Sequence, residues 1–272
     1  MPKQEVKVYV YDSGASAKPT LLLIHGLGDD ADTWRHVFIP LAEKYRVVAL
    51  DLPGFGRSDK PRRIYSIKFL RDVLIELMDA LSLGQVVLMG NSLGAILAEI
   101  VAIKHPTRVA GLVLLDGTVS APVFSYHRSF LLMALPLLGR RLYGSLRGNP
   151  QAAYDSLRLF FAHLENLPEA DRQFLYQRVN QRMWDDRQRD AFLSLLHQLV
   201  WCEPLRKHHF ARCLGRLCIP TQIIWGEHDA VLPVECAHDL LAKRPGCQLT
   251  VLPETGHIPQ QENPDAVVQV LI

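Results

Sequence analysis

A serine between two glycines, in residues 90–94 (Gly-Asn-Ser-Leu-Gly), is the stretch of this sequence best suited to chemistry. Residues 86–89 before it are continuously apolar, as in a buried strand, and residues 95–99 after it are mostly good helix formers. A serine at the sharp turn from strand to helix exposes its hydroxyl, and the glycines leave room where the backbone doubles back. Ser92 is therefore predicted to be a nucleophile at the positive end of a helix dipole.

A serine hydroxyl needs a base that takes its proton, and the base needs a carboxylate that holds it in the right tautomer. We looked for these groups in loops that follow the late strands. Asp229 comes after the apolar segment 221–225, and His257 comes after the segment 248–252. Asp116 also follows an apolar segment, so it competes with Asp229 for the role of the acid.

Other segments predict the elements that must position these groups. Residues 4–11 alternate polar and apolar, which predicts an antiparallel edge strand. The continuous apolar runs predict strands that are buried on both faces. Apolar residues at helical spacing, or a capping residue, predict helices between these strands. The first of these helices is expected to be capped by Asp32. The expected buried strands are 20–24, 46–50, 86–89, 111–115, 221–225 and 248–252, and the expected helices include 32–42, 66–81 and 234–242. This alternation predicts a mostly parallel, doubly wound α/β sheet with right-handed crossovers.

Two loops follow the first buried strands, at the sheet edge where α/β proteins bind ligands. The first, at residues 25–28 (His-Gly-Leu-Gly), contains a histidine that we expect to form local hydrogen bonds instead of transferring protons. The second, at residues 51–58, is rich in turn formers, and we expect Asp51 and Ser58 to support the site from behind.

The alternation of strand and helix fails between about residues 117 and 214, which predicts an inserted helical cap at 118–214 on a core of residues 1–117 and 215–272. The cap has 13 Lys and Arg against 8 Asp and Glu, a difference of +5, and the remainder has 17 against 20, a difference of −3. Its arginines are expected to form a solvated exterior, with recruitment of acidic substrates as the alternative.

Residues 130–138 of this cap are apolar almost all round, and Pro136 interrupts any helix through them. These side chains need cover. We expect them, Leu135 and Leu138 included, to line an apolar pocket over Ser92. Packing within the cap is the equally serious alternative, and contact with a lipid surface is a third.

Composition excludes several classes of function. A chain of 272 residues with 49% hydrophobic content can bury one full core, and a net charge of +2 without charge runs makes nucleic acid an unexpected partner. No stretch is long enough to span a bilayer, and residues 1–6 lack the apolar core of a signal peptide, so a cytoplasmic protein without membrane insertion is expected. The five cysteines lack metal-site spacing, so no metal is expected.

The sequence resembles an α/β-hydrolase-fold serine hydrolase of the esterase-like group with a helical cap. The resemblance covers nearly the whole chain and rests on five ordered stretches, which are 25–28 (His-Gly-Leu-Gly), 51–58 (Asp-Leu-Pro-Gly-Phe-Gly-Arg-Ser), 90–94 (Gly-Asn-Ser-Leu-Gly), 226–229 (Gly-Glu-His-Asp) and 256–257 (Gly-His). The order Ser92, Asp229, His257 is the order of this family.

The resemblance implies Ser92 as nucleophile, His257 as general acid and base, and Asp229 as its orienting partner. It also implies an oxyanion hole formed by the backbone N–H groups of Leu27 and Leu93, and it requires no cofactor. Although some relatives carry the acid at the position of Asp116, Asp229 is preferred. A monomer or small homo-oligomer is expected.

Three functions remain open at this stage. The first is hydrolysis of short- to medium-chain carboxylic esters through an acyl-enzyme, with a small-molecule ester as the partner. The second is hydrolysis of a carbon–carbon bond in a vinylogous diketone, because the Gly-Asn-Ser start of the elbow also resembles meta-cleavage-product hydrolases. Those relatives use cap arginines to hold a substrate carboxylate and an oxyanion-loop asparagine, whereas Arg35 and His36 follow Trp34 here. The third is a hydrolase-fold receptor that binds a ligand without useful turnover.

Overall fold

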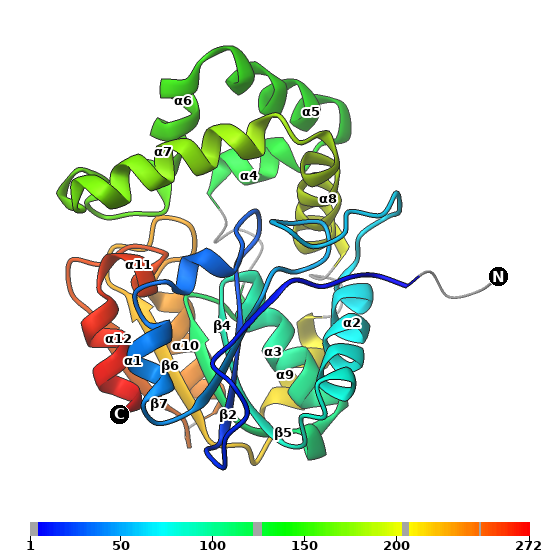
Figure 1. Ribbon diagram of the computed structural model, residues 1–272, viewed down its shortest axis with the longest axis vertical. Coiled ribbons are helices and arrows are strands. Elements are labelled where there is room, and N and C mark those ends of the chain that lie inside the picture. The colour runs from blue at the N-terminus through cyan, green and yellow to red at the C-terminus, as the bar shows by residue number, and fades with distance from the viewer. Residues whose placement is uncertain (1–4, 122–126, 203–206, 245) are drawn as a thin grey trace.

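A seven-stranded sheet forms the centre of the computed structural model, which describes residues 5–121, 127–202, 207–244 and 246–272 (Figure 1). The strand order is β1-β3-β2-β4-β5-β6-β7, with β1 antiparallel to β3 and the other neighbours parallel. The strands are β1 (Val10–Asp12), β2 (Thr20–Ile24), β3 (Arg46–Leu50), β4 (Val86–Asn91), β5 (Val109–Leu115), β6 (Thr221–Gly226) and β7 (Gln248–Leu252). The predicted mostly parallel, doubly wound sheet is confirmed.

The central strands are buried because helices cover both faces of the sheet. Alternate residues of β2 belong to different cores: Leu22 packs with α2 (Ile67–Ala80) and α3 (Leu93–Lys104), while Leu23 packs with the residues around α1 (Phe38–Ala42). This two-residue period is the expected consequence of side chains that point to opposite faces of a strand. The remaining core helices are α9 (Lys207–Leu214), α10 (Glu235–Lys243), α11 (Pro259–Glu262) and α12 (Pro264–Leu271).

Two predicted elements differ in the structure. The edge strand expected at 4–11 is reduced to β1, because residues 7–9 bond to the loop at 51–59 beyond the end of β3; residue 4 lies outside the described residues. The helix expected at 32–42 is divided into a 3-10 turn (Ala31–Trp34) and α1. The Asp30 carboxylate caps this turn by accepting from the N–H of Asp32, so the cap lies two residues earlier than expected.

Five helices stand above the carboxyl ends of the strands and form the cap (Figure 1). They are α4 (Arg128–Met133), α5 (Pro136–Ser145), α6 (Pro150–Asp155), α7 (Glu169–Met183) and α8 (Asp186–His197). Helix α9 lies inside the expected cap range 118–214, yet it contacts α3 of the core and lies below the cap helices (Figure 1). No helix in the described part of the chain has the length and apolar composition to cross a membrane.

Candidate active site

The backbone at Ser92 makes the sharp turn that the sequence predicted. Ser92 joins β4 to α3 with φ 55° and ψ −114°, a conformation that residues with side chains rarely adopt. A Cβ on Gly94 would lie 2.0 Å from the carbonyl oxygen of Ile24, so only glycine allows α3 to approach β2 this closely. The backbone N–H of Ser92 donates to the carbonyl of Leu115 at 2.8 Å, which fixes the turn against β5.

Asp229 and His257 come from two different loops and meet beside this turn. The β6 loop (residues 227–234) carries Asp229, and the β7 loop (residues 253–258) carries His257. The His257 Nδ1 lies 2.7 Å from the Asp229 Oδ2, and both side chains are buried. The other oxygen of Asp229 accepts the N–H groups of Val231 and Leu232 at 2.8 and 2.9 Å. The carboxylate is therefore held firmly and orients the histidine ring.

Ser92 and His257 line one cavity together. Among the described residues, no hydrogen bond joins the Ser92 hydroxyl to the His257 ring. The ring contacts Asp229 and the ring of Phe160. Serine–histidine contacts are often long in ligand-free enzymes and shorten when substrate binds. The Ser92 hydroxyl and the His257 ring thus border the same cavity, and the bond to Asp229 already orients the ring.

The β2 loop (residues 25–32) passes in front of Ser92. A Cβ on Gly26 would lie 3.4 Å from the Ser92 Cβ, and Leu27 lines the same cavity. His25 forms local hydrogen bonds, as predicted: its Nδ1 lies 2.7 Å from the carbonyl of Gly26, and its Nε2 accepts the N–H of Leu52 at 2.9 Å. Both ring nitrogens are occupied, so His25 shapes the loop.

Asp51 supports the β2 loop from behind. Its fully buried carboxylate accepts the N–H of Ala31 at 2.7 Å and three bonds from the Arg57 backbone and guanidinium at 2.7 to 3.0 Å. Burial alone would raise the pKa of Asp51, but the hydrogen bonds from Arg57 and Ala31 hold it below its usual value. An ionised Asp51 therefore ties the loop at 51–58 to the loop beside Ser92.

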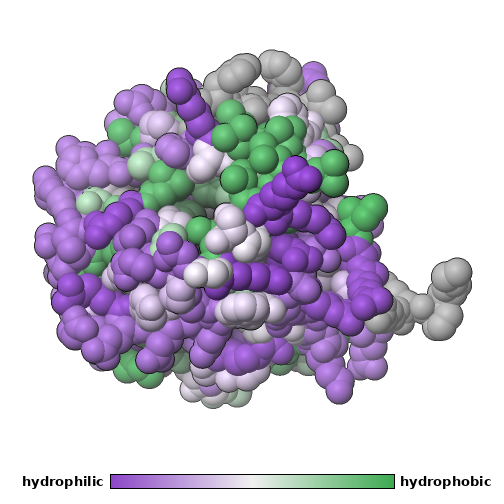
Figure 2. Space-filling model, turned by 90° about the horizontal axis from the view of Figure 1, so that it is seen from above, coloured by the Kyte–Doolittle hydropathy of each residue, from purple (hydrophilic) through white to green (hydrophobic). Residues whose placement is uncertain are grey.

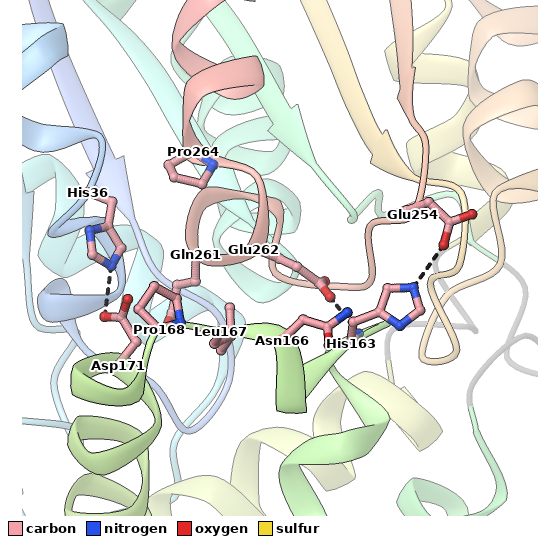
Figure 3. Close-up of a pocket in the computed structure, with 10 residues that line it drawn as sticks. All are labelled: His36, His163, Asn166, Leu167, Pro168, Asp171, Glu254, Gln261, Glu262 and Pro264. Atoms are coloured by element: carbon pink, nitrogen blue, oxygen red, sulfur yellow. Dashed lines mark hydrogen bonds and ion pairs between the residues drawn. The ribbon is translucent and has the colours of Figure 1, made fainter.

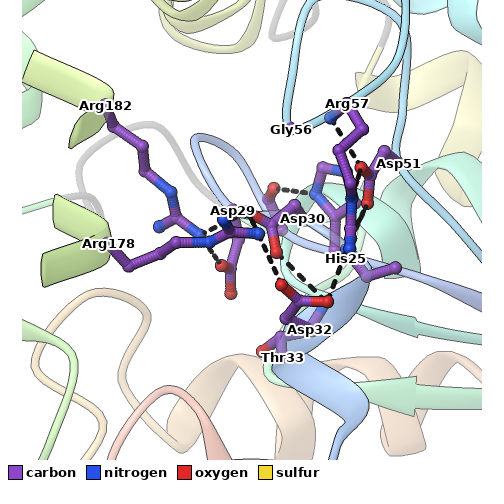
Figure 4. Close-up of polar contacts among 12 residues, drawn as sticks. His25, Asp29, Asp30, Asp32, Thr33, Asp51, Gly56, Arg57, Arg178 and Arg182 are labelled. Carbon is purple, nitrogen blue, oxygen red and sulfur yellow. Dashed lines mark hydrogen bonds and ion pairs between the residues drawn. The ribbon is translucent and has the colours of Figure 1, made fainter. Parts of the chain in front are cut away.

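Two arginines of α7 reach down from the cap to the same β2 loop (Figure 4). Arg182 bonds to the carboxylates of Asp29 and Asp30 at 2.7 and 2.9 Å, and Arg178 lies 2.5 Å from Asp32 and 3.0 Å from Asp30. Burial would raise the pKa of Asp30, but the charges of both arginines lower it. The expectation of a purely solvated arginine exterior is therefore wrong for these two residues, because three aspartates of the core offer them partners.

Comparison with known proteins decides the family of this fold and site. A family model described as the alpha/beta hydrolase fold matches residues 19–264, which include strands β2 to β7, the cap helices, Ser92, Asp229 and His257. The chain belongs to the α/β hydrolase fold family. The predicted family resemblance is confirmed.

Three proteins illustrate the range of similarity to this hydrolase. An uncharacterized protein of Mycobacterium tuberculosis is 32% identical over 94% of this chain and 75% of its own length. A 2-hydroxy-6-oxononadienedioate/2-hydroxy-6-oxononatrienedioate hydrolase of Cupriavidus pinatubonensis is 28% identical over 98% of this chain and 90% of its own. The structure of a thermophilic esterase from Thermogutta terrifontis superposes with a TM-score of 0.78 and 25% identity, covering 98% and 92% of the two chains.

The cavity at Ser92 in this hydrolase is small and mostly apolar. It encloses about 60 Å³, and its apolar wall consists of Phe130, Phe160, Leu196, Leu199, Val231 and Ile258. Asp29 is also among its lining residues, and no lysine or arginine of the described residues lines it. The space holds only a few water molecules, so it fits a short, uncharged group.

The expectation that Leu135 and Leu138 line this cavity is wrong. They are 41% and 37% exposed, and neither lines the cavity, whereas Phe130 from the same segment does. Phe130 and Ala134 lie one helical turn apart and form the buried face of the segment, which turns the other leucines outward. Figure 2, which views the molecule from above the cap, shows hydrophobic surface gathered there next to strongly hydrophilic surface.

A second, larger cavity lies between cap and core but away from Ser92 (Figure 3). It encloses about 430 Å³ and is lined in part by two histidine–acid pairs. His36 lies 2.9 Å from Asp171, and His163 lies 2.8 Å from Glu254, which raises the pKa of His163. Because these acids already have partners, the pairs join cap to core and leave no obvious reactive group.

Sequence reasoning missed two residues that hold the β7 loop. The Asn91 side-chain amide donates to the carbonyl of His257 at 3.0 Å, and so links the residue before Ser92 to the histidine. The Glu262 carboxylate accepts the N–H of Gly256 at 2.7 Å and that of His163, in the cap, at 2.8 Å. The Gly-Asn-Ser motif contained the signal for Asn91, whereas Glu262 lies in no motif.

A buried carboxyl lies beneath the entry to the cap. Glu99 of α3 has no exposed surface, and it accepts the N–H of Val119 at 2.6 Å and the hydroxyl of Thr118 at 3.0 Å. Burial raises the pKa of Glu99 to about 7, although these hydrogen bonds favour its charged form. Glu99 therefore titrates near neutrality at the point where the chain leaves the core.

Three side chains of the site are also close enough to share a metal ion. Among the described residues, Asp116, Asp229 and His257 form the group whose ligand atoms all lie within 4.8 Å of one another. However, 2.7 Å separates the nitrogen of His257 from the oxygen of Asp229. That is a hydrogen-bond distance, and it is shorter than the spacing of two atoms that each lie about 2.0–2.1 Å from a tetrahedral zinc ion. The geometry fits a hydrogen-bonded pair better than a pair of metal ligands.

Proposed function

We propose that this α/β hydrolase is a serine carboxylesterase that acts on short- to medium-chain esters of uncharged acids, beneath a cap of residues 118–214. The observation that carries the proposal is the cavity at Ser92, which combines an apolar wall with an oriented histidine. A neutral acyl group fits this wall, and no lysine or arginine among its described lining residues offers a partner to an anionic substrate.

In the proposed mechanism the Ser92 hydroxyl attacks the ester carbonyl while His257 Nε2 takes its proton. Asp229 orients the ring and stabilises its positive charge. The negative charge on the carbonyl oxygen is stabilised by the N–H groups of Leu27 and of Leu93, which is the first residue of α3 and has no partner within the helix. His257 then protonates the departing alcohol, and water releases the acid from the acyl-enzyme by the same steps.

A carbon–carbon bond hydrolase of the meta-cleavage-product type is the second candidate. It is favoured by the 28% identity to the Cupriavidus hydrolase over 98% of this chain. It is disfavoured by the arginines of the cap that reach the active-site region. Arg182 and Arg178 are paired with Asp29, Asp30 and Asp32, so neither is free to bind a substrate carboxylate.

The test compares p-nitrophenyl esters from acetate to laurate with a vinylogous 1,5-diketone acid. The wild-type protein should give its highest kcat/KM with a short or medium ester, and Ser92→Ala or His257→Ala should lower it by at least ~10³-fold. His127→Ala, at an exposed histidine of the cap, is the matched control and should retain activity. A higher kcat/KM with the diketone would favour the second candidate, and tight binding without turnover would favour a receptor.

A further inference from the structure

A second carboxyl group lies behind the Asp229–His257 pair. Asp116 follows the end of β5 with a left-handed backbone (φ 47°), and its side chain has no exposed surface. One oxygen of Asp116, one of Asp229 and a ring nitrogen of His257 all lie within 4.8 Å of one another. Two carboxyl groups thus share one dry site.

The hydrogen-bond donors around this pair are unevenly distributed. Both oxygens of Asp229 have donors, namely two backbone N–H groups on Oδ1 and the ring of His257 on Oδ2. Asp116 Oδ1 accepts the N–H of Gly226 at 2.8 Å. Asp116 Oδ2 is buried and has no donor among the described residues. An ionised Asp116 would therefore leave a buried negative oxygen without a partner, which is costly.

A proton on Asp116 removes this cost and the repulsion between the two groups. Two carboxylates in one buried site cannot both ionise easily, and Asp229 is the one with donors on both oxygens. Burial, and then the charge of Asp229, raise the pKa of Asp116 well above its usual range, and the N–H of Gly226 offsets only part of this. The charged and titratable groups that face Asp116 are Asp229, His257 and Glu262, and the charge of Glu262 acts in the same direction as that of Asp229.

We propose that Asp116 is a positioning residue that keeps its proton at neutral pH and donates it in a hydrogen bond to the Asp229 carboxylate. This bond holds Asp229 in addition to its bond with the His257 ring. It also withdraws negative charge from Asp229, so that a positive charge on His257 is stabilised less strongly. The proposal rests on the proposed function only in taking Asp229 as the orienting partner of His257.

The pH dependence of kcat/KM distinguishes this arrangement from an ionised Asp116. Asp116→Asn keeps a donor toward Asp229 and an acceptor for Gly226, so the midpoint of the acidic limb should stay within about 0.3 pH units of wild type. kcat/KM itself should fall only several-fold. Asp116→Ala removes the donor, so the midpoint should rise by about one pH unit, the effect of losing one hydrogen bond to a charged group.

An ionised Asp116 predicts the opposite sign. Its negative charge would stabilise protonated His257, so Asp116→Asn would move the acidic limb to lower pH by about a unit or more. That result would overturn the proposal, and it would make Asp116 the acid of the catalytic set. Asp79→Asn, which removes an exposed carboxylate paired with Arg108, is the control and should leave the profile unchanged.

A second measurement needs no activity and thus separates this proposal from the proposed function. The infrared difference spectrum of wild type minus Asp116→Asn at pH 7 should contain the C=O band of a protonated carboxylic acid, shifted in D2O. A carboxylate band in its place would overturn the proposal even if Asp116→Ala fails to fold. Loss of ester turnover in Ser92→Ala or its persistence bears only on the proposed function.

Discussion

The cap contacts two loops of the active site by different means. At the β2 loop, the contact consists of side chains: Arg178 and Arg182 of α7 form ion pairs with three aspartates. At the β7 loop, the main chain dominates: the N–H of His257 donates to the carbonyl of Phe160 at 2.8 Å, and the N–H of His163 donates to Glu262. The first junction depends on charged side chains, which substitutions remove, whereas the second retains the backbone bond from His257 to Phe160 when side chains are substituted.

The two junctions connect the cap to different parts of the proposed chemistry. The β2 loop carries Leu27, a proposed oxyanion donor, and the β7 loop carries the base. The cap therefore holds the oxyanion side through charge and the base side through backbone bonds. Substitutions at the two junctions should differ in size.

The largest effect is expected at the charged junction. Arg182→Ala leaves the half-buried Asp29 carboxylate and the buried Asp30 carboxylate each without one partner, so the free energy of unfolding should fall by about 3–5 kcal/mol. kcat should fall as well, because the β2 loop loses its support. Urea unfolding and ester kinetics measure both. Arg141→Ala, at an exposed cap arginine, is the matched control, and equal losses in both variants would show that the junction does not support the loop.

The next effect concerns Glu99, at the entry to the cap. The pKa of Glu99 is raised in the folded state from 4.5 to about 7, so the folded protein binds more protons than the unfolded chain between these values. Its contribution to stability is therefore present below about pH 4.5 and is lost as the pH rises to about 7.

Glu99→Gln should remove this slope. Across the full interval the loss amounts to on the order of 3 kcal/mol in wild type. Between pH 5 and pH 8 the free energy of unfolding should fall less in the variant than in wild type. Urea unfolding at several pH values measures this difference. Glu76→Gln, at an exposed acid of α2, provides a comparison, and an identical pH slope in wild type and Glu99→Gln would refute the assignment.

A smaller effect is expected at the backbone junction. Glu262→Ala leaves the N–H groups of Gly256 and His163 without their acceptor, which should cost about 1–3 kcal/mol of stability. kcat should change less than in Arg182→Ala, since the bond from His257 to Phe160 remains. Stopped assays across the ester series measure kcat. A loss of kcat larger than that of Arg182→Ala would reverse the comparison between the two junctions.

The smallest effect on rate concerns the cavity wall. Leu199→Ala should move the preferred acyl chain toward greater length, because each methylene that enters the new space adds ~0.8 kcal/mol, or roughly a fourfold gain in kcat/KM. Leu135→Ala should leave the preference unchanged, because its side chain is exposed and lies outside the wall. A shift in Leu135→Ala alone would mean that the cap rearranges around the substrate.

Much of the core and of the site was predictable from local sequence. Continuous apolar runs identified the buried strands, and Ser92, Asp229 and His257 follow such runs directly, so parallel pairing brings them to one edge. The bounds of α2 were equally local: the apolar stripe predicted a helix over 66–81, and the helix runs from Ile67 to Ala80.

The contacts between cap and core were not predictable in this way. Arg182 and Asp30 are 152 residues apart, and their pairing depends on how α7 lies over the β2 loop. The prediction that Leu135 and Leu138 line the cavity at Ser92 was wrong for a related reason. Residues 130–138 are apolar on every side, so their composition does not show which face is buried until Phe130 and Ala134 are seen to face inward.

The hydrogen bond from Asn91 to the carbonyl of His257 has a consequence for how this scaffold tolerates change. Because Asn91, a core residue next to Ser92, bonds to the main chain of His257, one link between these two residues lies wholly in the core, and the bond from His257 to Phe160 of the cap is the second link. A cap of different length or composition that still offers a carbonyl at the place of Phe160 would alter which molecules enter while the spacing of Ser92 and His257 persists. For protein engineering, such a cap could be exchanged to change substrate access while the spacing of the core residues at the site is kept.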